Sequence, residues 1–346
     1  MTVTRTSDLI EAARSGDEEA YRRLVEPLRG ELHAHCYRML ASVHDAEDAL
    51  QDALLRAWRG LPKFAGRSSF RAWLYKIATN TCLDVIARRP KRVLPLDYGP
   101  PADPHDGLAR PLSESVWVEP YPDQMFDVAD RLLGPEARYE QRESVELAFI
   151  AALQHLPARQ RAVLILREVL GFSAKEVAAT LDSTVQSVNS ALQRARKATD
   201  ERLPPESQQA TRRGLGDERM RELVDRYTNA WEDGDVDGVV ALLTEDAAGT
   251  MPPIPTWYRG REAVAEFLHT FAFAGADRRT RLLPTEASGQ PAFGGYRWNR
   301  DAGVYELGFL HVLTLRDARI QEITSFSGAG VLRACGLRER LPELQK

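Results

Sequence analysis

The hydrophobic residues of the first 90 positions recur at intervals of three and four. In the stretch from His44 to Leu61 the recurring apolar positions include Ala49, Leu50, Ala53, Leu54, Ala57, Trp58 and Leu61. Such spacing is typical of an amphipathic helix, because 3.6 residues per turn bring these positions onto one face. We therefore expect an all-α domain over residues 1–90.

The pattern breaks over residues 91–136. Nine of the chain's 20 prolines lie between Pro90 and Pro135. Proline fixes φ and lacks a backbone donor, so this composition predicts an acidic, proline-rich linker. Residues 116–126 nevertheless carry aromatic side chains that are unusual in a freely solvated spacer. We expect this segment to dock on a folded surface through Trp117, Glu119, Pro120 and Tyr121.

A second helical pattern covers residues 137–203. Its breaks, at Pro157, at 171–173 and at 181–184, predict short helices, the last two forming a helix-turn-helix. In the final helix Val188, Leu192 and Ala195 are expected to face inward. The outward set mixes hydrogen-bonding groups with cations, as expected for a helix that contacts base edges and phosphates. It comprises Thr184, Gln186, Ser187, Asn189, Ser190, Gln193, Arg194 and Lys197.

The period changes again over residues 211–333. An amphipathic helix with Tyr227 and Trp231 is followed by two further helices and then by strand-like runs at 304–315 and 320–326. We expect an α+β domain with a mostly antiparallel sheet. The predicted fold class is thus multidomain, with two all-α domains, the second containing a helix-turn-helix, and a C-terminal α+β domain.

Composition limits the function further. The 46 Lys and Arg against 50 Asp and Glu give a net charge of −4, which excludes a uniformly basic nucleic-acid binder. Three scattered cysteines are too few for a disulfide framework or a four-ligand zinc site, so we expect no metal and a reducing compartment. No secretion signal or membrane-spanning run is apparent, so we expect a cytoplasmic protein without a membrane partner.

Two surfaces in the first domain are candidates for binding. The helix after His44 carries an acidic face that suits a basic partner, with Asp45 as its expected cap. The helix after Ser69 combines cations, an amide and an aromatic ring, the groups that bind phosphates and stack on bases. Taken alone, each pattern is explained more readily by a solvated charged face, so the functional interpretation depends on the helix-turn-helix that follows.

The order of these motifs resembles a bacterial RNA polymerase sigma factor of the extracytoplasmic-function (ECF) class. DAEDALQDALLRAW resembles its polymerase-binding helix, FAGRSSFRAWLYKIATNTCLD its promoter-melting segment, and LPARQRAVLILREVLGFSAKEVAATL with STVQSVNSALQRARK its second DNA-binding domain. The resemblance implies core polymerase and promoter DNA as partners. It implies no cofactor, because the polymerase supplies the catalysis and its metal ions.

The resemblance also assigns roles to residues. It implies polymerase contacts for Asp45, Glu47, Asp48, Gln51 and Asp52, and contacts near the minus 10 element for Phe64, Arg67, Ser68, Ser69, Arg71, Lys76 and Asn80. The helix that begins at Thr184 would contact the minus 35 element. There, Asn189 and Ala191 replace cations that many relatives carry, so the promoter preference of relatives does not transfer to this chain.

The C-terminal block resembles the SnoaL-like members of the nuclear-transport-factor-two-like superfamily, through MPPIPTWYRGREAVAEFL and YELGFLHVLTL. The resemblance implies a cystatin-like curved sheet and helices that form a cone around a pocket. Candidate pocket residues are Trp257, Tyr258, Trp298 and His311. Related domains include enzymes and proteins without chemistry, and this chain offers no strong acid and base pair, so we do not expect an enzyme.

The function expected from these observations is that of a sigma factor whose C-terminal domain modulates its activity through intramolecular contacts. Two alternatives remain at this point: a ligand-sensing helix-turn-helix regulator, and a cyclase- or isomerase-like enzyme domain fused to a DNA-binding module. A small-molecule ligand, a separate anti-sigma partner and the oligomeric state are left open by the sequence.

Overall fold

The protein was analysed as a computed structural model that describes residues 6–112, 116–126, 135–274 and 279–343. The chain divides into two units. The helical unit comprises Met1–Lys91, Met125–Ser144 and Ala148–Leu203. The C-terminal unit comprises Arg92–Gln124, Val145–Leu147 and Pro204–Lys346, so it includes most of the proline-rich linker.

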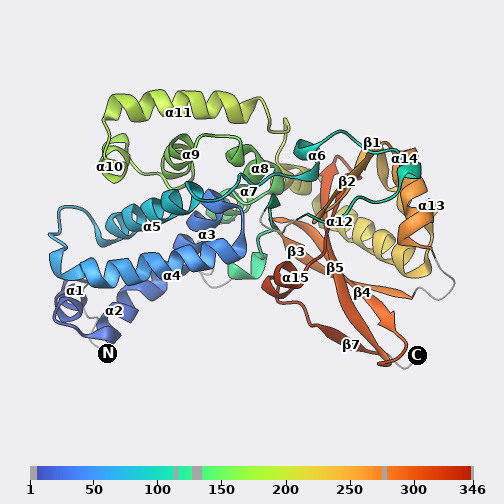
Figure 1. Ribbon diagram of the computed structural model, residues 1–346, viewed down its shortest axis with the longest axis horizontal. Coiled ribbons are helices and arrows are strands. Elements are labelled where there is room, and N and C mark those ends of the chain that lie inside the picture. The colour runs from blue at the N-terminus through green and yellow to red at the C-terminus, as the bar shows by residue number, and fades with distance from the viewer. Residues whose placement is uncertain (1–5, 113–115, 127–134, 275–278, 344–346) are drawn as a thin grey trace. The chain divides into compact units, whose positions relative to one another are not determined.

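The first part of the helical unit contains five helices (Figure 1). They are α1 (Thr6–Arg14), α2 (Glu18–Val25), α3 (Arg29–Leu40), α4 (Val43–Gly60) and α5 (Phe70–Ile86). Helices α3, α4 and α5 pack against one another and bury the predicted apolar stripe, including Leu50, Ala53 and Ala57. The helical prediction for this part is confirmed.

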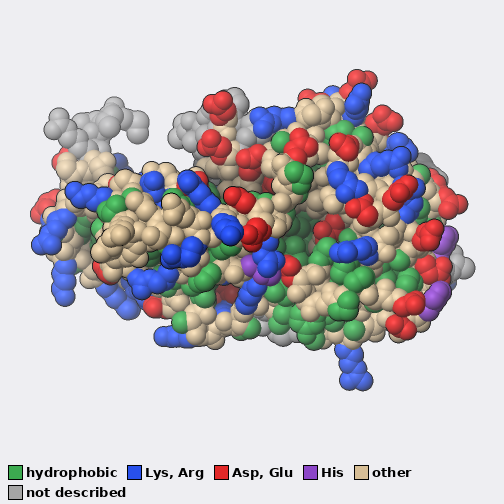
Figure 2. All heavy atoms as spheres, turned by 90° about the horizontal axis from the view of Figure 1, so that it is seen from above, with side chains coloured by type: hydrophobic (Ala, Val, Ile, Leu, Met, Phe, Trp, Pro, Cys, Tyr) green, Lys and Arg blue, Asp and Glu red, His purple; other side chains and the backbone are tan. Residues whose placement is uncertain are grey.

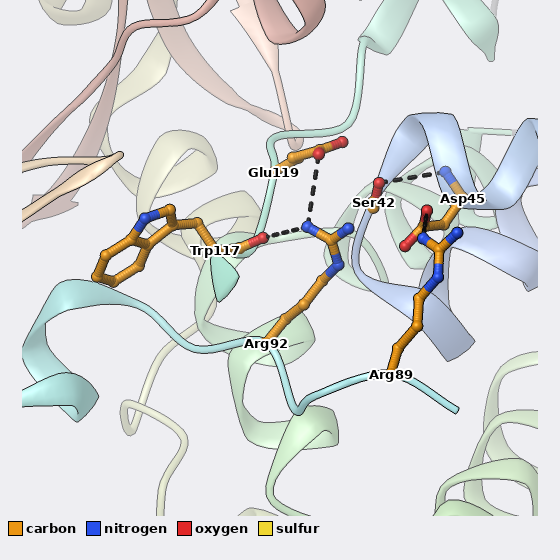
Figure 3. Close-up of polar contacts among 6 residues, drawn as sticks. All are labelled: Ser42, Asp45, Arg89, Arg92, Trp117 and Glu119. Carbon is orange, nitrogen blue, oxygen red and sulfur yellow. Dashed lines mark hydrogen bonds and ion pairs between the residues drawn. The ribbon is translucent and has the colours of Figure 1, made fainter. Parts of the chain in front are cut away.

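The capping of α4 differs from the expectation. Ser42 is the N-cap, and its hydroxyl accepts a hydrogen bond from the Asp45 amide at 3.2 Å (Figure 3). Asp45 lies one turn inside the helix, where its carboxylate pairs with Arg89. The sequence offers two capping residues three positions apart, and the serine takes the role because the helix begins at Val43.

The second part of the helical unit contains α7 (Pro135–Glu143), α8 (Leu147–Gln154), α9 (Ala158–Leu164), a π-helical turn (Ile165–Val169), α10 (Ala174–Thr180) and α11 (Val185–Asp200). Ser173 and Glu176 form a capping box at α10, and Thr184 caps α11. Val188, Leu192 and Ala195 are buried as predicted, so the outward set of α11 lies on the opposite face.

The C-terminal unit combines helices with one curved mixed sheet (Figure 1). Its helices include α6 (Pro95–Tyr98), α12 (Gln208–Asp233), α13 (Val236–Ala241), α14 (Arg261–Phe267) and α15 (Ala329–Ala334). Its strands are β1 (Leu243–Met251), β2 (Ile254–Arg259), β3 (Thr280–Ala287), β4 (Gln290–Asn299), β5 (Val304–Arg316), β6 (Arg319–Phe326) and β7 (Arg340–Pro342).

The strand order is β2-β1-β6-β5-β4-β3, and β7 pairs with the start of β5. Strands β1 and β6 run parallel, while the other pairs are antiparallel, which confirms the α+β prediction. Tyr227, Trp231 and Val239 from the helices pack with Phe293 and Leu313 from the sheet. Among the described residues, no helix combines the length and the apolar character needed to cross a membrane.

Gly295 on β4 provides a test of this packing. A Cβ atom at this position would overlap the ring of Phe309, its cross-strand neighbour on β5. We expect Gly295→Ala to lower the free energy of unfolding by about 1–3 kcal/mol through overpacking. Gly308→Ala on β5 is the matched control, because its Cβ would lie 3.7 Å from the nearest atom, in ordinary contact. Equal melting temperatures for the two variants would contradict this packing.

Candidate functional site

The acidic face predicted on α4 is present on the helical unit. Asp48 and Gln51 are exposed, and Glu47 and Asp52 are partly exposed. Glu47 bonds to Arg29 at 2.5 Å and Asp52 to Arg56 at 2.8 Å. Asp45 differs from these four residues, because it is buried and ion-paired to Arg89 (Figure 3).

Leu55 also belongs to this exposed face, although the sequence reasoning did not select it. Its side chain is 54% exposed and lies one turn after Gln51. An isolated exposed leucine is common, but here it stands among acidic and amide groups on one side of a helix. The available signal was its position outside the inward stripe formed by Leu50, Ala53 and Ala57.

The loop before α5 contains one buried aromatic residue and several exposed polar residues. Phe64 is buried, and its ring lies 4.9 Å from that of Trp73 and 6.0 Å from that of Phe70. Arg67, Ser68 and Ser69 are exposed, and the Ser69 hydroxyl caps α5. Phe64 therefore anchors the loop, while Arg67, Ser68 and Ser69 are accessible.

The candidate cations of α5 have partners inside the helical unit. Arg71 donates two hydrogen bonds of 2.8 Å to Glu31. Lys76 donates to the Ala179 carbonyl at 2.7 Å and to Asp182 at 2.8 Å, both within the helix-turn-helix. Asn80, one turn after Lys76, is half-buried. To contact DNA, Arg71 and Lys76 must exchange these partners.

Helix α11 presents its predicted polar set. Gln186, Ser187, Asn189, Gln193, Arg194 and Lys197 are exposed, Ser190 is half-buried, and Thr184 caps the helix. Figure 2 looks onto the face that carries α11, where Lys and Arg side chains border polar ones. Val185 is 44% exposed in the first turn, although the sequence reasoning did not select it.

Residues 116–124 of the docking segment lie within the C-terminal unit. Trp117 is only 2% exposed, and its indole N–H donates to the Pro253 carbonyl at 3.1 Å. The buried Arg92 guanidinium donates to the Trp117 carbonyl at 2.7 Å and reaches Glu119 at 3.5 Å (Figure 3). Both members of this ion pair are buried, so removing one partner would weaken the compensation of the other buried charge.

Tyr121 joins the turn between β3 and β4. Its amide donates to the Ser288 hydroxyl at 3.0 Å, and the Ser288 amide donates to the Tyr121 carbonyl at 2.7 Å. Pro122 forms an antiparallel bridge with Ala287, and the Gly289 amide donates to Asp123 at 2.9 Å. Both Tyr121 and the neighbouring Pro120 are buried.

The earlier linker residues cover the edge strand β2. The Ala102 amide donates to the Trp257 carbonyl, and the Trp257 indole donates to the Gly99 carbonyl, each at 2.8 Å. The Ala109 amide donates to the Thr256 hydroxyl at 2.9 Å. Since an uncovered edge strand exposes unpaired backbone groups, these bonds satisfy groups that would otherwise face solvent.

A cavity of about 440 Å³ opens in the C-terminal unit between the sheet and helices α12 and α14. Of the four candidate pocket residues, only His311 belongs to the described residues that border the cavity. The other three have different surroundings, because the alternation of strands and the linker direct their side chains elsewhere. Trp257 bonds to Gly99, Tyr258 stacks on Phe267, and Trp298 packs against Tyr305.

His311 is a neutral group in this cavity. Its Nδ1 atom lies 2.9 Å from the Tyr227 hydroxyl, and its ring is 4.4 Å from that of Phe309. Burial, with a smaller contribution from the positive charge of Arg297, lowers the pKa of His311 to about 3. No carboxylate is among the described residues that border the cavity, so His311 has no acidic partner there for proton transfer.

Comparison with family models identifies three segments. Residues 24–92 match Sigma-70 region 2, residues 146–198 match Sigma-70 region 4, and residues 224–323 match the SnoaL-like domain. The two helical segments and the C-terminal sheet thus define a sigma factor with an appended SnoaL-like domain.

Relatives agree over most of the length. The ECF RNA polymerase sigma factor SigG of Mycobacterium tuberculosis is 42% identical over 338 residues, 95% of this chain and 86% of that protein. The RNA polymerase sigma-H factor of Pseudomonas aeruginosa is 30% identical over 59% of this chain and 97% of its own length. The crystal structure of the M. tuberculosis sigma factor SigJ shares the fold, with a TM-score of 0.55, 20% identity and coverage of 90% of this chain and 98% of that one.

The chain belongs to the ECF RNA polymerase sigma factors. It directs transcription initiation by binding core RNA polymerase and promoter DNA. The predicted SnoaL-like domain is present as well.

The buried His311 predicts an acid-sensitive sheet. The pKa of His311 is depressed in the folded state, so unfolding takes up a proton below the ordinary value near 6.5, and stability falls as the pH falls through that value. We expect His311→Gln to remove about 2 kcal/mol of the loss between pH 7 and pH 5. Native-state hydrogen exchange of the β5 amides measures this. A variant of the exposed His269, His269→Gln, should keep the wild-type loss, and the same loss in His311→Gln would refute the assignment.

Proposed function

We propose that the C-terminal domain controls this sigma factor by holding the linker between its two DNA-binding regions. The observation that carries the proposal is that residues 92–124 fold with the C-terminal domain as one unit. Region 2 ends at residue 92 and region 4 begins at residue 146, so the linker sets how far the two regions can separate.

The docked contacts give this control a physical basis. Trp117 and Tyr121 are buried, and the backbone of the segment bonds to Pro253 at one end of the sheet and to Ser288 at the β3–β4 turn. A released chain spans up to about 3.3–3.6 Å per residue. Docking of residues 92–124 therefore shortens the accessible separation, and release lengthens it.

The surfaces that would contact polymerase and DNA follow from exposure and charge. We assign polymerase binding to the exposed face of α4, formed by Glu47, Asp48, Gln51, Asp52 and Leu55, with the buried Asp45 supporting its first turn. An exposed apolar side chain beside acidic and amide groups is consistent with an interface that combines apolar and polar contacts.

We assign contacts near the minus 10 element to the loop at Arg67, Ser68 and Ser69 and to Arg71, Lys76 and Asn80 of α5. Phe64 holds the loop in place. The bonds of Lys76 to Asp182 and Ala179 are partly exposed, and partly exposed ion pairs contribute only about 0–1 kcal/mol. Exchange of these partners for DNA phosphates is therefore energetically accessible.

We assign the minus 35 element to α11, through Thr184, Gln186, Ser187, Asn189, Ser190, Gln193, Arg194 and Lys197. The helix begins at a capped N-terminus and presents amide and hydroxyl groups in its first two turns, followed by cations. This order places hydrogen-bonding groups where a recognition helix approaches base edges and cations where it approaches phosphates.

The linker proposal is tested by the double variant Trp117→Ala and Tyr121→Ala in the full chain. Loss of two buried rings should release the segment, so hydrogen exchange of residues 99–124 should accelerate. Promoter-specific transcription with core polymerase should change by about fivefold or more, the size of a typical coupling between sites. Arg110→Ala, an exposed change in the same linker, is the control. Faster exchange with unchanged transcription would rule out control by the linker.

The α11 assignment is tested by two single variants in polymerase holoenzyme on a library of minus 35 sequences. Asn189→Ala should cost about 1–3 kcal/mol on the preferred sequence and relax discrimination at one base pair. Lys197→Ala should weaken binding on all sequences alike and reduce the slope of log affinity against log salt by about 1. A uniform loss for Asn189→Ala would assign that side chain to the phosphate backbone instead.

A further inference from the structure

The cavity of the SnoaL-like domain has the size and lining of a small-molecule site. Its volume of about 440 Å³ lies within the usual range for ligand pockets, roughly 300–1,000 Å³. Trp231, Met251, Phe267, Phe271 and Ile323 supply most of an apolar wall. A cavity with this lining favours a compact hydrophobic body over the many water molecules that would otherwise fill it.

One part of the wall is polar and positive. Arg297 and Thr280, directly paired across β3 and β4, both border the cavity. The Arg297 guanidinium lies 5.4 Å from the Phe309 ring centroid, and the Phe309 ring lies against His311. Because the Arg297 guanidinium borders this end of the cavity, an anionic oxygen is the polar group that fits it.

The linker forms part of the same wall. Leu108 borders the cavity and is 39% exposed. Its position is fixed on both sides, because the Ala102 amide before it bonds to the Trp257 carbonyl and the Ala109 amide after it bonds to the Thr256 hydroxyl. A molecule in the cavity would therefore bury additional surface on Leu108 only while the linker is docked.

We propose that this cavity binds a small apolar molecule bearing one anionic oxygen group, that Arg297 holds that group, and that Leu108 makes the docked linker part of the site. By linkage, such a ligand stabilises the docked linker by the same factor by which docking strengthens ligand binding. The binding site stands on the geometry of the cavity alone, whereas its effect on transcription rests on the proposed function above.

Two fluorescent probes that differ by one charge test the site in the full chain. One is 8-anilinonaphthalene-1-sulfonate, and the other is its uncharged counterpart N-phenyl-1-naphthylamine. We expect saturable binding of both at one site. Arg297→Met should weaken the sulfonate by about tenfold or more and the neutral probe by less than about twofold. Arg297→Lys, which keeps the charge, should retain sulfonate binding within about threefold.

Arg281→Met is the matched control for the arginine. Arg281 is next to Thr280 on β3 but lies on the other face of the sheet, with its guanidinium 5.6 Å from the Tyr305 ring. The Arg281→Met variant should bind both probes with the affinities of the wild type. Equal sulfonate affinities for Arg297→Met and Arg281→Met, with both variants folded by their melting curves, would overturn the anion site. Absence of saturable binding in the wild type would overturn the cavity as a ligand site.

The linker part of the proposal has its own test. Leu108→Ala should weaken both probes about threefold to tenfold, whereas Leu112→Ala, the same change at a residue outside the cavity wall, should not. Saturating sulfonate should slow hydrogen exchange of the Ala102, Ala109 and Leu112 amides. Unchanged exchange with bound probe would overturn the coupling. Probe binding as expected together with unaltered transcription in the Trp117 and Tyr121 variant would reject control by the linker and leave the ligand site standing.

Discussion

The two edge strands of the C-terminal sheet expose backbone groups that need partners, and the linker supplies them. At the β2 edge, Ala102 and Leu112 donate to carbonyls of Trp257 and Pro253. At the other edge, Pro122 pairs with Ala287 at the end of β3. An open edge left without such cover is prone to pair with other chains. A segment that the sequence presents as a spacer is thus a structural part of the SnoaL-like domain.

Much of the fold was predictable because its signals are local. The interval of three and four in the first domain, the capping residues at Ser173 and Thr184, and the alternating runs of β5 and β6 each determine one element by near neighbours in the sequence. The docking segment was also visible, since aromatic residues in a proline-rich stretch have little reason to remain in water. Its partners were not, because the bonds from Trp117 to Pro253 and from Tyr121 to Ser288 join residues distant in the chain.

In the candidate sites too, features set by neighbouring residues were predictable, whereas contacts between residues distant in the chain were not. The polar set of α11 could be deduced from helical periodicity alone. The pairing of Lys76 with Asp182 could not, because it joins two domains that periodicity treats separately. In the cavity, His311 was recognisable as a polar residue in an apolar strand, whereas Arg297 and Leu108 required the curvature of the sheet and the path of the linker. Leu55 and Val185 were not selected, because the sequence reasoning chose polar and charged side chains for the binding faces, and both apolar side chains are exposed.

The balance of energies explains why a docked linker is suited to control. Fixing the backbone of one residue costs about 1–2 kcal/mol, while a typical hydrogen bond returns only about 0.5–1.5 kcal/mol net. The bonds along residues 99–124 therefore offset only part of the ordering cost, and burial of Trp117, Val118 and Tyr121 must provide much of the remainder. A segment whose stabilising contacts are largely offset by its ordering cost is released by a modest loss of contact. In the proposed mechanism, a ligand that covers Leu108 adds contacts and so stabilises the docked segment. Ligand binding in the cavity and the separation of the DNA-binding regions are then coupled through the docking equilibrium of the linker.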